Sequence, residues 1–223
     1  MKQLKISNNV IRRLPRYLRA LEELKAEGAD RVSSSSLGEK MGLTSSQIRQ
    51  DFSCFGEFGQ QGYGYNVKDL STEIASILGT DRGFSLVVVG VGNIGRALIE
   101  SFCFAQYGFE LAAAFDIREE LVGKVINGVE VKNVYDYKQV LEGKKIDAAV
   151  LSVPKRLANE AANAIADLGI KAIWNFTNVE LSIENPNVIV EDIHFSDSLL
   201  TMSYYLAESI DINDSDSNKQ EKM

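Results

Sequence analysis

The sequence predicts an α/β protein of two domains, a small helical one followed by a parallel β-sheet covered by helices. Three observations predict this class. Short amphipathic segments separated by glycines fill the first 80 residues. A glycine-rich turn then lies between an apolar run and an apolar-periodic segment near residue 90, and apolar runs alternate with helical patterns from there to about residue 195. At 223 residues the chain is long enough for two separate cores.

The composition is that of an ordinary globular protein, with 45% apolar and 25% charged residues. No apolar run approaches the roughly 20 residues that span a bilayer, and the first residues contain no apolar signal segment. We therefore expect a cytoplasmic protein that does not enter a membrane. The only cysteines, Cys54 and Cys103, lie far apart and His194 is the only histidine, so we expect no metal site.

Charge is distributed unevenly along the chain, although its net charge is −7. Residues 1–80 contain 11 basic and 9 acidic side chains, a net of +2, whereas the remaining 143 residues have a net of −9. The first 20 residues contain six basic side chains and no acidic one. This asymmetry favours a polyanionic partner at the N-terminal end, although a solvated basic helix face would give the same count.

The first two predicted helices are short and end at glycines. Apolar residues at three-and-four spacing predict a helix that stops at Gly28 and contains Pro15. Ser34–Ser36 can cap a second helix over residues 37–41, which Gly42 ends. The apolar face of the first helix is formed by Ile11, Leu14, Leu18, Leu21 and Leu24.

A third helix, Ser45–Phe55, completes a helix-turn-helix pattern. The run Thr44-Ser-Ser-Gln47 predicts a capping box, in which the Thr44 hydroxyl accepts from the Gln47 amide and the Gln47 side chain reaches back. Two short helices joined by a glycine-containing turn are typical of this DNA-binding motif. The side chains expected to point outward from the third helix are Ser45, Ser46, Gln47, Arg49 and Gln50, which suit base edges and phosphates.

A glycine-rich stretch follows, with four glycines in the nine positions from Gly56 to Gly64. Such a stretch predicts a tight hairpin or wing beside the recognition helix. Residues 67–78 then predict one more amphipathic helix, ending at Gly79. Residues 1–80 therefore read as a winged helix-turn-helix domain, although a small helical dimerisation domain fits the same pattern.

The turn from Gly90 to Gly95, Gly-Val-Gly-Asn-Ile-Gly, follows the apolar run 85–89 and opens a helix near Ile94. In a Rossmann domain the first glycine allows a tight turn, the second lets the backbone approach a pyrophosphate, and the third allows close packing of helix and strand. This context, strand then turn then helix, makes the motif far more specific than the glycines alone. A turn that binds nothing is the competing interpretation.

Asp116 stands 21 residues after Gly95, at the end of the apolar run 111–115. A carboxylate there can accept both ribose hydroxyls of a dinucleotide. It would repel a 2′-phosphate, so the sequence favours NAD over NADP. The nucleotide-binding domain is expected to span residues 81–195.

The rest of this domain continues the strand and helix alternation. Asn127-Gly128 predicts a hairpin, residues 148–153, 172–175 and 188–190 read as strands, and Pro154 suits the first turn of a helix running to Gly169. Lys155 and Arg156 at that helix start face either a ligand phosphate or solvent.

The C-terminal segment Phe195–Leu206 is too apolar all round to be a free surface helix, so it needs a partner. We expect a dimerisation helix over residues 196–209. Residues 210–223 are rich in Asp, Asn, Ser and Lys and are expected to be disordered.

Six segments together resemble the Rex family of redox-sensing transcriptional repressors. The resemblance runs from about residue 10 to residue 207, and it implies a homodimer that binds palindromic operator DNA through winged helices. It also implies release of the operator when NADH replaces NAD⁺, and a C-terminal helix swapped onto the other subunit. The segments are Arg-Leu-Pro-Arg-Tyr-Leu-Arg at 13–19, Arg-Gln-Asp-Phe-Ser-Cys-Phe-Gly at 49–56, Gly-Tyr-Gly-Tyr-Asn-Val at 62–67, the turn at 90–95, Leu-Ser-Val-Pro at 151–154 and Trp-Asn-Phe-Thr at 174–177.

The resemblance implies NAD(H) as the cofactor and assigns two sets of residues. The nucleotide is expected to contact Gly90, Val91, Gly92, Asn93, Ile94, Gly95 and Asp116, and on the nicotinamide side Val153, Pro154, Asn175, Phe176 and Thr177. Without the family, Asn175 would be as readily a strand-end residue that caps a loop. The DNA is expected to contact Arg12, Arg13, Arg16, Ser45, Ser46, Gln47, Arg49, Gln50, Gln61, Gly62 and Tyr63.

Some positions depart from the family pattern. Ser101 stands where members usually carry a tyrosine that packs on the nicotinamide, and His194 stands where they carry an aspartate. Both belong in the family to the ligand-dependent network of Arg19, which this chain keeps, and Asp197 is a candidate replacement. We therefore expect a weaker preference for NADH over NAD⁺ than members usually show. Gln50 and Gln61 replace Lys or Arg, which removes charge from the DNA side.

Other functions compete with this one. An NAD-dependent oxidoreductase with a helical extension would need a positioned acid–base group, and no such motif stands out, so we expect no enzyme. A nucleotide-binding protein without DNA binding would lack operator affinity. Coenzyme A in the same cleft is a third alternative, but Asp116 disfavours its 3′-phosphorylated ribose.

Overall fold

The computed structural model describes residues 6–56, 59–60 and 63–220. The chain divides into two compact units, Met1–Gly83 and Phe84–Met223, with the division three residues beyond the boundary predicted at residue 80. Each unit has its own buried core. The two are described separately below.

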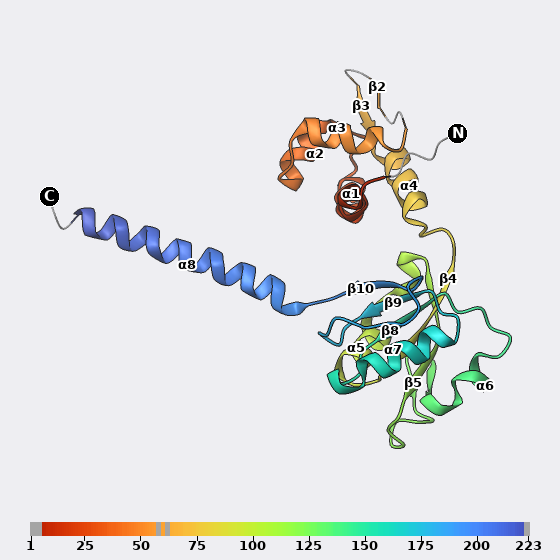
Figure 1. The fold of residues 1–223 in the computed structure, drawn as a ribbon. Coiled ribbons are helices and arrows are strands. Elements are labelled where there is room, and N and C mark those ends of the chain that lie inside the picture. The colour runs from red at the N-terminus through yellow and green to blue at the C-terminus, as the bar shows by residue number, and fades with distance from the viewer. Residues whose placement is uncertain (1–5, 57–58, 61–62, 221–223) are drawn as a thin grey trace. The chain divides into compact units, whose positions relative to one another are not determined.

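The N-terminal unit consists of four helices and a small antiparallel sheet (Figure 1). Its strands lie in the order β1-β3-β2, and the β2–β3 hairpin occupies the position of the predicted wing. The elements are α1 (Asn8–Ala26), β1 (Arg31–Val32), α2 (Ser34–Met41), α3 (Ser45–Ser53), β2 (Gly59–Gln60), β3 (Gly64–Asn66) and α4 (Val67–Leu78).

The buried face of α1 differs in part from the predicted one. Leu14 and Leu21 are buried as expected, but Ile11 is 45% exposed, and Tyr17, which the apolar spacing omitted, is 0% exposed. Tyr17 packs edge-on against Phe52 of α3, with ring centroids 4.8 Å apart. A tyrosine can be buried this deeply because its hydroxyl has a hydrogen-bond partner, which is described below.

All four helices of this unit begin at a side-chain cap. Ser7, Ser33, Thr44 and Asn66 each accept a hydrogen bond from the amide three residues later, at 3.0–3.4 Å. The Thr44 half of the predicted capping box is therefore present. The return half is wrong, because the Gln47 side-chain amide donates to Asp51 instead, at 2.8 Å.

The second unit is a seven-stranded sheet with helices on both faces. All neighbouring strands are parallel except β6 and β7. Its elements are β4 (Phe84–Val89), α5 (Asn93–Ser101), η1 (Phe104–Tyr107), β5 (Phe109–Asp116), β6 (Val125–Ile126), β7 (Val129–Asn133), η2 (Val134–Asp136), α6 (Tyr137–Leu141), β8 (Ala148–Leu151), η3 (Lys155–Leu157), α7 (Ala158–Asp167), β9 (Ala172–Asn175), β10 (Ile189–Asp192) and α8 (Phe195–Gln220).

The strand order, β10-β9-β8-β4-β5-β7-β6, identifies a Rossmann fold with a topological switch point. From β4 the chain passes to β5 on one side, and it later returns to β8 on the other side of β4. Ligands of such sheets bind beyond the carboxyl ends of the strands at this point. Buried residues of α5 and η1 pack against one sheet face, and those of α6 and α7 pack against the other.

Local details follow the sequence with small shifts. Asn127 and Gly128 have φ values of 46° and 80°, as a tight hairpin requires. The strand predicted to reach Val153 ends at Leu151, and the helix predicted after Pro154 starts as the 3₁₀ turn η3 before α7.

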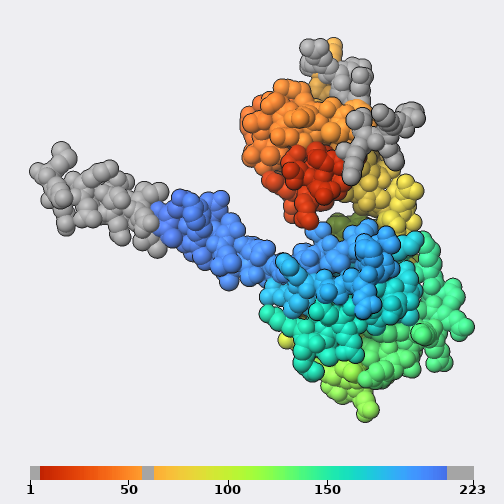
Figure 2. Space-filling model, viewed as in Figure 1, coloured from red at the N-terminus to blue at the C-terminus, as the bar shows by residue number. Residues whose placement is uncertain are grey.

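Helix α8 is longer than predicted. Its part up to residue 209 lies at the surface of the single chain (Figure 2), and its large apolar side chains are exposed. The helix continues to Gln220, through most of the tail that was predicted to be disordered. Once a helix has formed, each further residue adds a hydrogen bond at little cost, so a polar continuation can stay helical. None of the helices in the described residues is long and apolar enough to cross a membrane. The large apolar residues that α8 exposes are Phe195, Leu199, Leu200, Met202, Tyr204, Tyr205 and Leu206.

Candidate nucleotide and nucleic-acid sites

The glycine turn connects β4 to α5 at the switch point of the sheet. Gly90 has φ 92°, and a Cβ there would lie 2.6 Å from the Ser152 carbonyl oxygen. A Cβ at Gly95 would collide with the Gly90 carbonyl oxygen. At Gly92, by contrast, a Cβ would meet none of the described residues within 4 Å. Two glycines thus allow close packing, and Gly92 leaves open space.

That open space lies at the N-terminus of α5. Gly92 is the N-cap residue, and no side chain of the described residues caps the helix there. The first amides of a helix are unsatisfied without a cap and favour an anion. Asn93 and Ile94 are exposed beside the turn, and the Ser152 hydroxyl fixes it to the end of β8 by donating to the Gly90 carbonyl at 2.7 Å. The turn therefore offers open space beside uncapped helix amides, the kind of position where a phosphate binds.

Asp116 ends β5 and lies against the same turn. Its carboxylate accepts from the Val91 amide at 2.7 Å and from the Arg118 amide at 2.9 Å. The Arg118 guanidinium forms a fork on it, with Nε 3.0 Å from Oδ1 and Nη2 3.2 Å from Oδ2. Nη2 also donates to the Val91 carbonyl at 3.0 Å. Asp116 is thus joined to the turn directly and through Arg118.

Burial disfavours the charged form of Asp116, but the hydrogen bonds from Arg118 and Val91 outweigh it and hold the pKa of this carboxyl below its usual value. The carboxylate is therefore ionised at neutral pH. Sequence reasoning missed Arg118. Its position two residues after the strand-end acid was the available signal, since a side chain there can fold back over the carboxylate.

The residues predicted on the nicotinamide side lie beyond β8 and β9. Asn175 is buried, and its side chain is saturated: Nδ2 donates to Val179 O and to Asp192 at 2.8 and 2.7 Å, and Oδ1 accepts from the Thr177 amide and hydroxyl at 3.0 and 2.7 Å. This pattern suits a residue that shapes the loop. The predicted ligand contacts of Asn175 and Thr177 stay predictions.

Aromatic rings fill the neighbouring space. Phe176 packs edge-on against Trp174, with centroids 4.6 Å apart, and Trp174 lies 5.5 Å from Phe102. Phe102 stacks on Tyr107 at 5.2 Å with an interplanar angle of 18°. Phe102 directly follows Ser101, which is exposed at the end of α5. Val153 is half-buried, whereas Pro154, Lys155 and Arg156 are exposed.

The other predicted switch residue, His194, lies between β10 and α8. Its Nδ1 is 2.9 Å from Oδ1 of Asn178, whose φ of 58° lies in the left-handed region. Asp197, suggested above as a replacement partner for Arg19, accepts a bond from Ser196 at 3.4 Å. Arg19 belongs to the N-terminal unit, so its relation to these residues stays a prediction.

In the N-terminal unit a buried carboxylate joins α3 to α1. Asp51 is fully buried and accepts from Arg13 Nε and Nη2 at 2.6 and 2.8 Å, from the Tyr17 hydroxyl at 2.7 Å and from Gln47 Nε2 at 2.8 Å. Burial opposes ionisation, but these hydrogen bonds lower the pKa of Asp51 below its usual value. Burial raises the pKa of Tyr17, and the hydrogen bond from its hydroxyl to Asp51 raises it further.

This network engages two of the predicted DNA contacts. Arg13 and Gln47 point at Asp51, so any contact of theirs with DNA competes with an internal partner. Ser45 is half-buried, whereas Ser46, Arg49 and Gln50 are exposed on α3, and Arg49 donates to Ser34 Oγ at 3.2 Å. The exposed part of α3 therefore carries three of its five predicted contacts.

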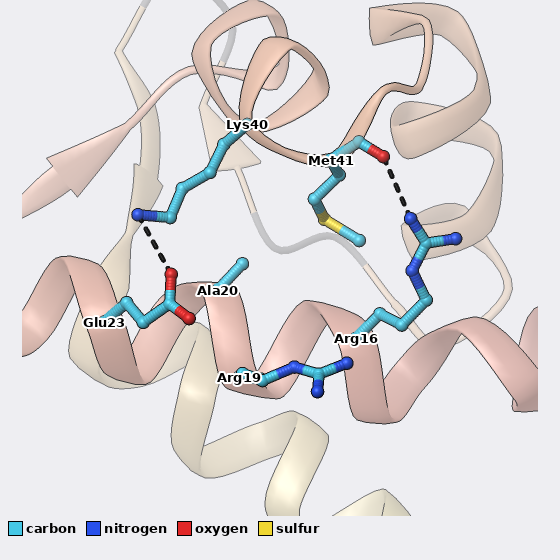
Figure 3. Close-up of a pocket in the computed structure, with 6 residues that line it drawn as sticks. All are labelled: Arg16, Arg19, Ala20, Glu23, Lys40 and Met41. Atoms are coloured by element: carbon cyan, nitrogen blue, oxygen red, sulfur yellow. Dashed lines mark hydrogen bonds and ion pairs between the residues drawn. The ribbon is translucent and has the colours of Figure 1, made fainter. Parts of the chain in front are cut away.

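The remaining predicted contacts lie on α1 and the wing. Arg12 is exposed, and Arg16 donates to the Met41 carbonyl at 2.9 Å across a cavity of about 200 Å³ between α1 and α2, lined also by Arg19, Glu23 and Lys40 (Figure 3). Lys40 pairs with Glu23 at 3.1 Å. Tyr63 is exposed, and its carbonyl accepts from Arg31 at 3.1 Å. Gln61 and Gly62 lie outside the described residues.

Comparison with known proteins gives matches over both units. Residues 5–53 match a family model described as "Putative DNA-binding protein N-terminus", and residues 81–179 match the CoA binding domain. The redox-sensing transcriptional repressor Rex of Clostridium beijerinckii is 50% identical over 92% of this chain and 96% of its own length. Rex of Clostridium acetobutylicum is 48% identical over 93% of this chain and 96% of its own.

Solved structures agree. The crystal structure of RSP in complex with β-NAD⁺ and operator DNA has a TM-score of 0.86 and 46% identity, covering 93% of this chain and 95% of its own. The crystal structure of RSP in complex with β-NADH also has a TM-score of 0.86, at 42% identity over 94% of this chain and 98% of its own. Sequence and fold therefore agree over nearly the whole chain, which belongs to the Rex family of redox-sensing transcriptional repressors.

Proposed function

We propose that this chain is a cytoplasmic transcriptional repressor that binds operator DNA as a homodimer and releases it when NADH binds. One observation carries the proposal: an open glycine turn joined to an ionised strand-end acid in one unit, and a helix-turn-helix with an exposed third helix in the other. The relatives named Rex, and RSP with its nucleotides and operator, support both halves.

NAD(H) fits the residues of the turn. The open space at Gly92 and the uncapped amides of α5 suit the pyrophosphate, and the ionised Asp116 suits the adenosine ribose. The nicotinamide half would then lie toward Val153, Pro154, Asn175, Phe176 and Thr177. The bound cofactor supplies the redox state that the protein senses, and the chain supplies binding and orientation.

The DNA-binding half uses the exposed side chains of α3. Arg49 can approach guanine or phosphate, and Gln50 can form the bidentate pair that favours adenine. Arg12 and Arg16 on α1 would neutralise backbone phosphates. Tyr63 lies on the exposed wing. The recognition helix would then read the major groove, as helix-turn-helix proteins do.

A homodimer follows from α8. Its seven exposed large apolar residues lie on one helix, as at a protein interface, and a second copy of the chain would bury them. Regulation, and not catalysis, is the activity we assign. Hydride transfer to a substrate needs a positioned acid–base group, and the one histidine of the chain is bonded to Asn178.

The test is a binding titration with the full-length protein and an AT-rich palindromic operator, at one stated salt concentration, with NAD⁺ and NADH added separately. We expect operator binding that NADH weakens more than NAD⁺ does. Arg49→Ala should weaken binding about tenfold or more, as loss of a base or phosphate contact does, whereas Arg82→Ala, also exposed, should not. Absence of binding to every family-like palindrome would overturn the proposal.

A second candidate is a Rex-like repressor with weakened nucleotide discrimination. The observation that favours it is the exposed Ser101 at the end of α5, which cannot stack on a nicotinamide, together with His194 bonded to Asn178. A ligand shifts an equilibrium only by its difference in affinity for the two states. Calorimetric titration of both nucleotides separates the candidates, and a strong NADH preference excludes the second. Ser101→Tyr with His194→Asp should increase the response to NADH.

A further inference from the structure

We propose that Arg118 makes the adenosine end of the site accept a ribose that carries a 2′-phosphate, so that this chain binds NADP(H) as well as NAD(H). The inference rests on the proposed nucleotide binding. It reverses the expectation that Asp116 restricts the site to NAD. The reason is that Asp116 does not act alone in the structure.

All the acceptor positions of Asp116 are occupied by this chain. A carboxylate has about four lone-pair sites, and four donors reach it: the Val91 amide, the Arg118 amide, and Arg118 Nε and Nη2. The two backbone donors are fixed by the turn and the strand end. A ribose hydroxyl can therefore reach the carboxylate only by displacing the Arg118 guanidinium.

The guanidinium is the mobile partner. The Arg118 side chain is 46% exposed, whereas that of Asp116 is 6% exposed. When the guanidinium leaves, Asp116 keeps its two backbone hydrogen bonds, and ribose hydroxyls can donate to the two acceptor positions that the guanidinium vacates. Arg118 loses one further contact, to the Val91 carbonyl. A movement of one half-exposed side chain is enough to open the ribose site.

The charge of the Asp116–Arg118 pair determines whether a ribose with a 2′-phosphate can bind here. A lone acid at the end of the second strand repels a 2′-phosphate, which is the physical basis of NAD preference. Here a guanidinium sits on the acid at 3.0 Å, so the pair together has no net charge. Arg is also the side chain whose planar fork matches a phosphate in a bidentate manner. A phosphate on the ribose can therefore take the guanidinium from Asp116.

Two positions of one side chain would then serve two ligands. With NAD(H), the ribose hydroxyls replace the guanidinium at Asp116 and Arg118 turns to solvent. With NADP(H), the 2′-phosphate pairs with Arg118 next to the turn. The contrast with Arg13 shows why only one of the two pairs can do this: Arg13 is 23% exposed, and its acid is completely buried among three partners.

The experiment titrates NADH and NADPH separately into the full-length protein, following nucleotide fluorescence and heat. We expect the NADPH dissociation constant to lie within about tenfold of that for NADH. Arg118→Ala should weaken NADPH at least about tenfold and change NADH by less than about threefold. Lys171→Ala is the matched control, because Lys171 is exposed at the opposite, amino end of β9 and its loss removes the same charge.

The outcomes are distinct. If NADH binds and NADPH is about a hundredfold or more weaker in the wild type, the inference is wrong. If Arg118→Ala weakens both nucleotides equally, or Lys171→Ala reproduces its effect, the role assigned to Arg118 is also wrong. Coenzyme A, with a 3′-phosphate, is a third ligand arm, and tighter binding than NADPH would contradict the 2′ assignment. If no nucleotide binds, the proposed function itself fails. Circular dichroism of each variant checks that it is folded.

Discussion

The two units each contain an ionised aspartate held by an arginine, and the two pairs are built differently. Asp51 is completely buried and accepts from three side chains, so its pair is closed by the protein itself. Asp116 accepts from two backbone amides and one half-exposed guanidinium beside an open turn. The first pair fixes two helices together, whereas in the second a ligand can reach the acid by displacing one half-exposed guanidinium.

The helix starts show the same contrast. Every helix of the N-terminal unit has a side-chain cap, whereas α5 begins at Gly92 with none from the described residues. A unit that must present a rigid surface satisfies its own polar groups. The uncapped amides of α5 lie at the open turn, where a pyrophosphate is proposed to bind. The missing cap matters at this helix because of that open space, since in the part of the chain that the structure describes α6 and α7 also begin without a side-chain cap.

The largest effect is expected from Asp51→Ala. Removing one partner of a buried pair leaves an uncompensated charge, so the N-terminal unit should lose about 3–5 kcal/mol of its free energy of unfolding. Urea unfolding followed by circular dichroism measures this. Asp81→Ala, a change at an exposed aspartate, should stay within about 0.5 kcal/mol. An equal loss in the two variants would show that the Asp51 network is not structural.

Two glycine variants test the turn, and the loss of stability expected from them is intermediate. Gly95→Ala puts a Cβ against the Gly90 carbonyl oxygen and should cost the nucleotide unit about 1–3 kcal/mol by overpacking. Gly92→Ala meets no described residue within 4 Å, so it should leave stability nearly unchanged and weaken nucleotide binding instead. Urea unfolding and calorimetric titration of both variants separate these effects. The comparison fails if Gly92→Ala destabilises the unit as much as Gly95→Ala.

The smallest loss of stability is expected from removing the N-cap side chain of α3. Thr44→Ala removes the hydroxyl that accepts from the Gln47 amide at 3.2 Å and should cost about 1 kcal/mol, as N-cap losses do. Thr72→Ala is the control, because Thr72 is an exposed helix residue whose hydroxyl only bonds back to the Lys68 carbonyl. Thermal unfolding of the two variants gives the difference. Equal melting temperatures would mean that the cap does not stabilise the helix.

Much of the fold could be predicted because its signals are local. The glycine turn, the hairpin at Asn127-Gly128 and the cap at Thr44 each require a particular residue type at a particular backbone conformation. The parallel strands could be recognised from their apolar runs without knowing which strands pair with one another. The burial of Tyr17 could not be predicted from spacing, because it depends on Asp51, which lies 34 residues away along the chain.

The site contacts were harder to predict than the fold because, like the burial of Tyr17, they depend on the folded structure. The positions of Gly90, Gly92, Gly95 and Asp116 follow from the motif, but how each side chain is engaged depends on contacts between segments. Arg13 and Gln47 read as DNA contacts from charge and helix position, yet both donate to Asp51. Arg118 had no motif of its own, and only the folded strand end brings its guanidinium onto Asp116.

Helix α8 has a consequence for every binding measurement on this protein. Because its apolar side chains are exposed in the single chain, the proposed dimer would form by mass action, and its population would depend on protein concentration. Each such dimer would present two recognition helices to one palindrome, so the second half-site would be met at a high effective concentration. At dilutions where dimers dissociate, an operator titration would report subunit assembly and would hide the response to the nucleotide.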